Sequence, residues 1–383
     1  MKVSAIIVSY KVPYHLLLCL GSLKKALTPL DSEIIVVDNA SNDQTSSLVS
    51  KHFPQVKYIQ NQTNDGFSGA NNIGIKEAQG EYICLINPDT VISENCISSA
   101  IKKHESLDKA GILGVRLIDG TGNFLPESKI NKLTLRVAAF KMLGFSSSYY
   151  NNNLHSADEG KTSTLVGAFM CFRKQDYQKV DGLDERYFMY GEDIDLSYQF
   201  SKAGFNNYYL GKESILHFKG ESTLRDEVYF KRFFGSVELF FKKHYTNSKF
   251  ILSVISFFFI IAKWFKKSDM EKRNRLTSSF ESIYLIGEDS EFLPLLKSSF
   301  NKPVKTLEFN TAENFNFHDS LIVFNPESLS YQQIIKLMLK YRNSDNIFRI
   351  KLVNQNVLIG SDSSTSQGKV VFLKCDKCVN LEQ

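Results

Sequence analysis

Short apolar runs alternate with amphipathic stretches at the start of the chain. The runs, Val3 to Ser9, Glu33 to Asn39 and Tyr82 to Ile86, are rich in β-branched residues and too short for helices, so they predict buried parallel strands. Two longer stretches, His15 to Leu27 and Ser41 to Phe53, have the apolar spacing of helices. This alternation indicates an α/β domain with right-handed crossovers.

A second alternation of the same kind follows residue 280. Its apolar runs predict strands at 282–286, 320–324, 347–353, 357–359 and 370–373, with helices at 290–300 and 329–341. We therefore expect a second, smaller α/β domain of about one hundred residues. It carries a lone glycine, Gly287, after its first strand and no phosphate-loop pattern. The sequence assigns it no chemistry and leaves bracing, oligomerisation or docking of a partner open.

Two aspartates follow predicted strands of the first domain. Asp38 ends the run that starts at Glu33, and Asp89 lies in the turn Asn87-Pro88-Asp89-Thr90 after Ile86. Ligands of open α/β sheets bind at the carboxyl ends of strands, and carboxylate oxygens suit Mg²⁺ or Mn²⁺. An ordinary turn, in which Asp89 bonds its own backbone, is the alternative. The two strand ends together indicate a nucleotide site.

A loop rich in glycine and asparagine, Asn64 to Ile75, lies between these strands. It contains Asn64, Gly66, Phe67 and Asn71, and its small residues open a predicted helix. The free N–H groups at such a helix start can approach a phosphate. The spacing differs from the dinucleotide fingerprint, and a plain loop-to-helix connection would look similar.

Further candidate groups come later in the first domain. Glu192, Asp193 and Asp195 stand in the first turn of a predicted helix, where acidic residues commonly serve as caps and dipole partners. A positioned carboxylate there is also the usual base for an attacking hydroxyl. His217 follows a short apolar run, and from its position alone a lone histidine is more often a structural group than a ligand.

Taken in order, these motifs resemble those of the family-2 inverting glycosyltransferases, in particular the rhamnosyltransferase-like branch. The segments that carry the resemblance are Ser4 to Tyr10, Val36 to Ser41, Asn64 to Phe67 with Asn71 to Gly74, Asn87 to Asp89, Gly167 to Met170, Gly182 to Glu185, Tyr190 to Leu196 and His217 to Ser222. They extend over residues 1 to about 235. The resemblance implies a nucleotide-sugar-binding glycosyltransferase A fold, a divalent cation and sugar transfer from a nucleotide diphosphate to an acceptor hydroxyl.

The resemblance also implies a role for each matched residue. Asp193 is the expected base, and Glu192 is expected to hold the acceptor or orient the base. Asp89 and His217 are the expected ligands of Mg²⁺ or Mn²⁺. The residues expected to bind the donor are Ser9, Tyr10, Asp38, Asn64, Gly66, Phe67, Asn71 and Asn87.

The chain departs from the family at one position. Members often have an arginine a few residues after the acidic pair, whereas this chain has Gln199 near that place. A cationic partner for the diphosphate or the base is therefore missing or supplied elsewhere, with Lys219 and Arg225 as candidates.

The net charge of +5 is concentrated in one segment. Residues 231 to 275 contain eleven lysines or arginines and three acidic residues, together with the apolar run Phe250 to Ala262 between Lys249 and Lys263. Thirteen helical residues span about 20 Å, less than the roughly 30 Å hydrocarbon core, so the run predicts an interfacial rather than a spanning helix. A buried inter-domain helix is the alternative. No aromatic-basic motif for nucleic acid is present.

The remaining features concern compartment and organisation. Met1-Lys2 leads directly into the first strand without a signal peptide, and Cys19, Cys84, Cys96 and Cys171 lie in apolar elements, which favours a reducing cytoplasm. Cys375-x-x-Cys378 lacks the second pair of a zinc site. We expect a catalytic domain at 1–235, a basic membrane-associating linker at 236–279 and a small α/β domain at 280–383.

These observations predict an enzyme on the inner face of the cell membrane. It would be an inverting, metal-dependent glycosyltransferase that moves a sugar from dTDP-rhamnose or a UDP-hexose to a lipid-linked glycan in cell-surface polysaccharide synthesis, with oligomerisation left open. The alternatives are a glycosyltransferase-fold scaffold that has lost catalysis, for which the absent arginine is the one hint, and a nucleotidyltransferase. The nucleotidyltransferase gives no reason for the basic apolar segment.

Overall fold

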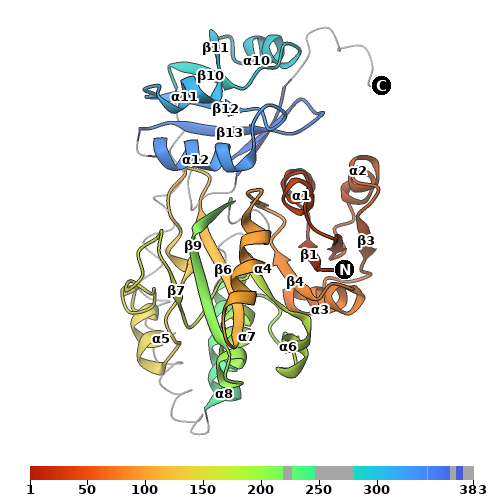
Figure 1. Cartoon of the computed structure of the whole chain (residues 1–383), viewed down its shortest axis with the longest axis vertical. Coiled ribbons are helices and arrows are strands. Elements are labelled where there is room, and N and C mark those ends of the chain that lie inside the picture. The colour runs from red at the N-terminus through yellow and green to blue at the C-terminus, as the bar shows by residue number, and fades with distance from the viewer. Residues whose placement is uncertain (219–226, 246–279, 343, 363–367, 374–383) are drawn as a thin grey trace.

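The computed structural model describes residues 1–218, 227–245, 280–342, 344–362 and 368–373. The chain forms two sheet-based units, with the carboxyl-terminal unit stacked on one end of the larger amino-terminal unit (Figure 1). The candidate residues belong to the larger unit. The predicted α/β class is confirmed for both units.

The larger unit is built on a mixed sheet in the order β3-β2-β1-β4-β8-β6-β9-β5, with β7 paired to β9. The strands β1 to β4 are parallel, and β8 joins β4 antiparallel. The strands are β1 Val3–Ser9, β2 Ser32–Asp38, β3 Lys57–Gln60, β4 Tyr82–Ile86, β5 Thr90–Val91, β6 Ala110–Ile118, β7 Glu159–Lys161, β8 Phe169–Arg173 and β9 Asn206–His217.

Helices cover both faces of this sheet because its central strands are apolar on both sides. Val3, Ala5 and Ile7 pack with α1 and α4, whereas Ile6 and Val8 pack with α3 and α7. Strands that are buried on both faces of a sheet have continuous apolar sequences. The helices are α1 Pro13–Leu27, α2 Thr45–His52, α3 Gly66–Glu77, α4 Cys96–Ser106, the 3₁₀ turn Pro126–Ser128, α5 Leu135–Met142, α6 Lys174–Lys179, α7 Glu192–Lys202 and α8 Glu227–His244.

The smaller unit has the sheet order β11-β10-β12-β13-β14-β15, with the first four strands parallel and the last two antiparallel. Its strands are β10 Ser282–Ile286, β11 Val304–Leu307, β12 Ser320–Phe324, β13 Ile347–Lys351, β14 Val357–Gly360 and β15 Lys369–Phe372, and its helices are α10 Phe292–Phe300, α11 Phe309–Glu313 and α12 Tyr331–Tyr341. The expected strands and helices are present. β11 and α11 were not expected, because their short sequences are largely half-exposed and lack a clear apolar pattern.

A shared apolar cluster joins the two units. Leu17 and Leu18 of α1 and Phe218 after β9 pack with side chains of α12 such as Ile334 and Met338. At the start of α12, the Glu94 carboxylate accepts hydrogen bonds from the N–H groups of Tyr331 (2.7 Å) and Gln332 (2.9 Å). The larger unit thus caps a helix of the smaller one, which fixes their relative position.

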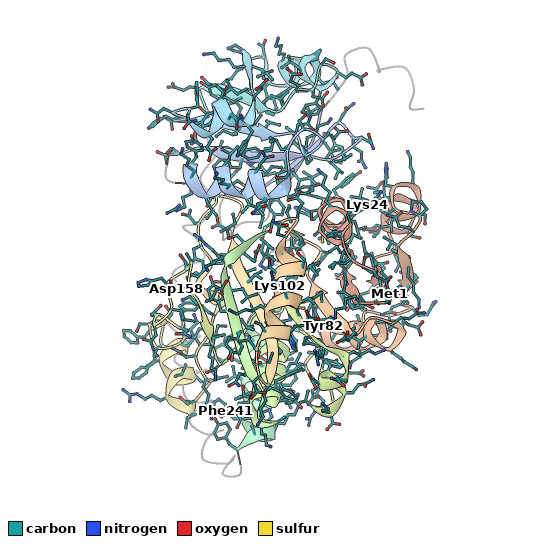
Figure 2. All side chains as sticks on the ribbon, viewed as in Figure 1. Met1, Lys24, Tyr82, Lys102, Asp158 and Phe241 are labelled. Carbon is teal, nitrogen blue, oxygen red and sulfur yellow. The ribbon has the colours of Figure 1, made fainter. Side chains whose placement is uncertain are left out.

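Helix α8 runs from Glu227 to His244 and so crosses residue 235, where the expected domain division lies. Its Phe240 and Phe241 are buried against α5 and α7, at the end of the molecule remote from the smaller unit (Figure 2). In the part of the chain that the structure describes, no helix combines the length and apolar character needed to cross a bilayer. Phe250 to Ala262, Lys219, Arg225, Cys375 and Cys378 lie outside the described residues.

Candidate active site

The first part of the site is the end of β2. Asp38 is buried, and its carboxylate accepts hydrogen bonds from the Ser41 hydroxyl and from Gln60 Nε2 (2.6 Å). The next residue, Asn39, donates from Nδ2 to Asn64 Oδ1 (2.9 Å) and to the Gly66 carbonyl (2.9 Å). Asn39 therefore fixes the glycine-rich loop to the strand end. Sequence reasoning missed this role, although Asn39 lies directly beside Asp38.

Ser9 and Tyr10 lie beside this corner. In the parallel register of β1 and β2, Ser9 pairs with Asp38, and the Ser9 carbonyl accepts the Asn39 N–H (2.8 Å). The Ser9 hydroxyl is buried and has no hydrogen-bond partner among the described residues, whereas the Tyr10 ring is half-exposed beside Lys11. The structure thus brings Ser9, Tyr10, Asp38 and Asn64 together at one rim of the sheet.

Position 66 of the glycine-rich loop requires glycine for two reasons. Gly66 has a φ of +73°, and a Cβ there would lie 2.3 Å from the Phe188 carbonyl oxygen. The adjacent Phe67 N–H donates to that same carbonyl (2.7 Å). Asn71 is buried and donates to the Phe67 carbonyl (2.9 Å), so its amide stabilises the start of α3. The loop is thereby held against the segment that precedes α7.

The predicted metal ligands meet at the end of the sheet. β5 pairs with β9 so that Thr90 lies opposite His217, and the Phe218 N–H donates to the Asp89 carbonyl (3.0 Å). This pairing places Asp89 Oδ1 3.4 Å from His217 Nε2, and Asn87 Nδ2 is also 3.4 Å from that nitrogen. Asn87, Asp89 and His217 therefore form one cluster.

The Asp89 carboxylate is buried among imidazoles. Burial by itself would raise its pKa, but the neighbouring His217 and His15 outweigh that effect and hold the pKa below its usual range. Burial lowers the pKa of His15 to about 4, so this imidazole is neutral at physiological pH. His15 was not singled out in the sequence. Its place in an otherwise apolar helix face gave no functional signal.

The acidic pair lies at the start of α7. The Asp193 carboxylate accepts hydrogen bonds from the N–H groups of Gly167 (3.2 Å) and Ile194 (2.8 Å). Burial raises the pKa of Asp193, although these two N–H groups oppose the shift. Burial also raises the pKa of Glu192 well above its usual range, and the neighbouring Asp193 charge raises it further. The two N–H bonds favour the ionised form of Asp193, whereas burial and the Asp193 charge both favour the protonated form of Glu192.

The turn that precedes β8, at Gly167 and Ala168, contacts the other parts of the site. The Gly167 N–H reaches Asp193, and the Ala168 carbonyl accepts the Asn87 N–H (3.1 Å). A Cβ on Gly167 would lie 3.4 Å from the Phe67 ring and 3.7 Å from the Asp193 Cβ. The glycine loop, the Asp89 turn and the acidic helix therefore converge on Gly167 and Ala168.

Several buried polar atoms of this region lack a protein partner among the described residues. They are Ser9 Oγ, Asn87 Oδ1, Glu192 Oε2 and His217 Nδ1. Buried polar groups are normally paired, and each unpaired one carries a cost of about 1–3 kcal/mol. Their concentration here indicates a site whose partners come from a ligand.

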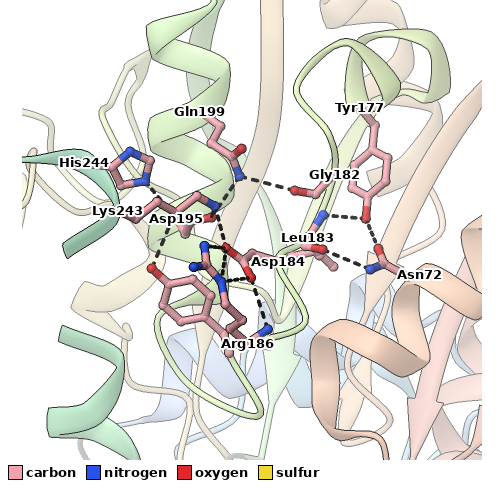
Figure 3. Close-up of polar contacts among 11 residues, drawn as sticks. Asn72, Tyr177, Gly182, Leu183, Asp184, Arg186, Asp195, Gln199, Lys243 and His244 are labelled. Carbon is pink, nitrogen blue, oxygen red and sulfur yellow. Dashed lines mark hydrogen bonds and ion pairs between the residues drawn. The ribbon is translucent and has the colours of Figure 1, made fainter. Parts of the chain in front are cut away.

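A network behind the acidic pair was missed by sequence reasoning (Figure 3). The buried Asp195 carboxylate contacts Lys243 Nζ (2.8 Å) and His244 Nε2 (2.6 Å) of α8, and Gln199 Nε2 donates to it (2.8 Å). Lys243 also contacts Asp184 (2.8 Å). Gln199 thus bonds to Asp195 of its own helix, and Lys243 and Arg186 are the cations that the structure places on Asp195 and Asp184.

The Asp89 and His217 cluster suits a divalent cation shared with a phosphate. Among the described residues no group of three or more His, Cys, Asp or Glu side chains could hold a metal ion. Mg²⁺ is often bound by one or two carboxylates, with waters and substrate phosphates completing its shell. A buried carboxylate next to an imidazole nitrogen fits that mode, and it leaves most ligand positions to the substrate.

Comparison with known proteins identifies the larger unit. Residues 4–181 match the model described as glycosyl transferase family 2, and residues 155–222 match the N-terminal domain of galactosyltransferase. The N-acetylglucosaminyl-diphospho-decaprenol L-rhamnosyltransferase of Mycobacterium tuberculosis is 28% identical over 237 residues, which cover 57% of this chain and 76% of that protein. Rhamnosyltransferase WbbL of Escherichia coli is 27% identical over 211 residues, which cover 51% of this chain and 78% of that protein.

A solved mannosyltransferase of Pyrobaculum calidifontis, in complex with GDP-Man and Mn²⁺, matches at 15% identity and a TM-score of 0.46 over 69% of this chain and 75% of that chain. Similarity at this level assigns no role to any residue here. The family assignment rests on the sequence matches and on the α/β sheet described above. The larger unit of this chain is therefore a family-2 glycosyltransferase domain, similar to that of rhamnosyltransferases.

Proposed function

We propose that this enzyme is an inverting, metal-dependent glycosyltransferase that moves a sugar from a nucleotide diphosphate to a hydroxyl of a lipid-linked glycan during cell-surface polysaccharide synthesis. The observation that carries the proposal is the convergence of the Asp89 and His217 cluster with Asp193 on the turn at Gly167 and Ala168. The names of the two bacterial relatives favour rhamnose as the sugar, and that of the mycobacterial relative favours a polyprenyl-diphosphate sugar as the acceptor.

The acidic pair would act on the acceptor. Asp193, whose ionised form two backbone N–H groups stabilise, takes the proton of the attacking hydroxyl, and Glu192 in its protonated form holds that hydroxyl through its unpaired Oε2. The acceptor oxygen forms a bond to the anomeric carbon as the bond from that carbon to the diphosphate oxygen breaks. Attack opposite the leaving group inverts the configuration, and the nucleoside diphosphate departs.

The strand ends would hold the donor. Ser9, Tyr10, Asp38 and Asn64 lie at the rim for the nucleoside, and Gly66, Phe67, Asn71 and Asn87 lie between that rim and the acidic pair. A divalent cation, Mg²⁺ or Mn²⁺, held by Asp89 and His217 would supply positive charge to the diphosphate oxygens that become negative as the bond breaks.

The remaining expectations stay part of this proposal. We place the enzyme on the cytoplasmic face of the membrane, with a catalytic domain, a basic linker within 236–279 and a small α/β domain that holds α12 against the catalytic unit. The donor is dTDP-rhamnose or a UDP-hexose. The scaffold alternative rests on the absent arginine, and Lys243, which contacts Asp195 and Asp184, would supply a cation near the acidic pair in its place.

A thermal-shift screen of nucleotide sugars with Mn²⁺ tests donor binding, because a ligand that binds only the native state raises the melting temperature. At one hundred times the dissociation constant the stabilisation is about 2.7 kcal/mol. We expect dTDP-rhamnose or a UDP-hexose to give a shift that is lost in chelator and in Asp89→Ala. A protein that no nucleotide sugar stabilises would contradict the proposal.

A further inference from the structure

Helix α5 exposes an apolar patch at its carboxyl-terminal end. Phe140, Leu143 and Phe145 are 37%, 40% and 63% exposed, and they make up three of the five exposed large hydrophobic side chains among the described residues. Arg136, Phe140 and Leu143 are four and three residues apart, so they share one face of the helix. We call Phe140, Leu143 and Phe145 the α5 patch.

The α5 patch is a fixed feature of the fold. The Phe145 N–H donates to the Phe140 carbonyl (2.9 Å) and the Gly144 N–H donates to the Lys141 carbonyl (3.1 Å), with Gly144 at a φ of +93°. These bonds are the glycine-terminated helix end that brings the following residue back onto the last turn. The rings of Phe140 and Phe145 accordingly meet edge to face at 6.4 Å.

The opposite face of α5 is anchored in the catalytic unit. Ala138 is buried in a cluster with Phe240 and Phe241 of α8, and Val137 packs against that cluster. The patch therefore faces away from the core to which α5 is attached. Leu143 and Phe145 can be replaced by polar residues without opening that core.

The charge along the segment that carries the patch has one sign. Residues 128 to 157 contain four lysines or arginines and no aspartate or glutamate. The Arg136 guanidinium lies 5.5 Å from the centre of the Phe140 ring, and Lys132 and Arg136 are exposed. The Lys141 ammonium lies 4.5 Å and 4.4 Å from the rings of Tyr149 and Tyr150. Exposed apolar side chains beside cations and tyrosines are the combination that binds the interface of an anionic bilayer.

Helix α5 itself lies beside the start of α7. A small cavity is lined by Ala138 and Lys141 of α5 together with Gly191 and Ile194, which flank Glu192 and Asp193. α5 and α8 lie at the end of the molecule remote from the smaller unit (Figure 1). A bilayer in contact with the patch would therefore leave the smaller unit in water.

We propose that the α5 patch, with Lys132, Arg136 and Lys141, is a membrane-contact surface for anionic phospholipid. Contact at this surface presents the acidic pair to an acceptor whose lipid remains in the bilayer, a consequence that rests on the proposed function. An acidic protein partner is the competing occupant that the test must separate.

A tryptophan reporter tests the contact directly. The chain has a single tryptophan, Trp264, so Trp264→Phe with Phe145→Trp places the only indole in the patch. We expect a blue shift of its emission and quenching by brominated lipid on vesicles that contain phosphatidylglycerol, both reduced in high salt. Unchanged emission on these vesicles would overturn the proposal and leave a protein partner as the occupant.

Vesicle flotation of the full chain measures how much the basic residues and the apolar residues each contribute to membrane binding. Lys132→Gln with Arg136→Gln should weaken partitioning to anionic vesicles about thirty-fold, from roughly five-fold for each basic residue. Leu143→Ser with Phe145→Ser should weaken it at least about tenfold. Phe372→Ser, which removes a similarly exposed ring from the smaller unit, is the matched control and should float like wild type. Wild-type flotation by both patch variants would contradict the proposal.

Turnover separates this inference from the proposed function. Leu143→Ser with Phe145→Ser should slow transfer to a lipid-linked acceptor in vesicles and leave transfer to a water-soluble acceptor analogue unchanged. If the reporter inserts but no acceptor supports turnover, the proposed function fails and the membrane contact stands. If turnover is normal in every variant and the reporter does not insert, the membrane contact fails alone.

Discussion

Replacing the predicted base, Asp193→Asn, tests the chemistry with almost no change of shape. The carboxylate accepts two backbone N–H groups, from Gly167 and Ile194. The introduced amide has one acceptor oxygen, so one of these N–H groups loses its partner at a cost of about 1–3 kcal/mol. Removal of a buried charge offsets part of that cost. We therefore expect a folded protein with a modestly changed melting temperature.

The effect on catalysis should be much larger. General-base catalysis contributes about 10²- to 10⁴-fold, which is roughly 3–5 kcal/mol of activation free energy. Release of nucleoside diphosphate in the presence of acceptor should fall by at least about a hundred-fold, while the KM for the donor stays near the wild-type value. In wild type, kcat/KM should decline as pH falls, because burial raises the pKa of Asp193 and protonation removes the base.

The control for this variant is Asp181→Asn, an exposed aspartate with a φ of +60° that asparagine also tolerates. It should keep wild-type turnover. If Asp193→Asn is folded, binds donor and retains turnover within about fivefold of wild type, Asp193 is not the base and the reasoning is refuted.

Three further predictions concern the metal, the acidic pair and the junction between the units. Asp89→Ala should abolish Mn²⁺-dependent binding of the donor and His217→Ala should weaken it less, because a neutral ligand contributes less charge; equal binding in chelator, measured by calorimetry, would remove the metal from the account. Because the pKa of Glu192 is raised in the native state, the native protein still holds a proton that the unfolded chain has released. The free energy of unfolding therefore falls as pH rises, by about 1.4 kcal/mol for each pH unit by which the native pKa exceeds the unfolded one. Glu192→Gln should consequently melt higher than wild type at pH 8 and by a smaller margin at pH 5, and a difference independent of pH would contradict the elevated pKa. Glu94→Ala leaves the Tyr331 and Gln332 N–H groups without their carboxylate and should lower stability by about 1–3 kcal/mol in urea unfolding, whereas Glu94→Gln keeps one acceptor and should lose less; an unaffected Glu94→Ala would show that this contact does not hold the units together.

The sequence predicted what local patterns encode. The apolar runs of β1, β2 and β4 are buried on both faces, so their composition alone marked them as strands, and Asp38 and Asp89 followed from where those runs end. The sequence also predicted that a helix begins near Glu192, where α7 starts. These features depend on neighbouring residues in the chain.

Long-range contacts account for what the sequence did not reveal. The pairing of β5 with β9 brings His217 to Asp89 across more than a hundred residues, and the resemblance, not the pattern, indicated that meeting. Lys243 and His244 gave only the signal of a basic helix end, which is typical of solvated charges, yet they bind Asp195. The half-exposed strand β11 lacked an apolar pattern and was missed.

The account depends most on acceptor-dependent transfer at Asp193. The most direct measurement is the release of nucleoside diphosphate from dTDP-rhamnose and UDP-hexoses, with and without a polyprenyl-diphosphate-linked sugar, by wild type and by Asp193→Asn in Mn²⁺. The account predicts release that requires both acceptor and metal in wild type and is lower by about a hundred-fold or more in the variant. A folded, donor-binding wild-type protein that releases no nucleoside diphosphate with any lipid-linked acceptor would contradict it and leave the scaffold alternative.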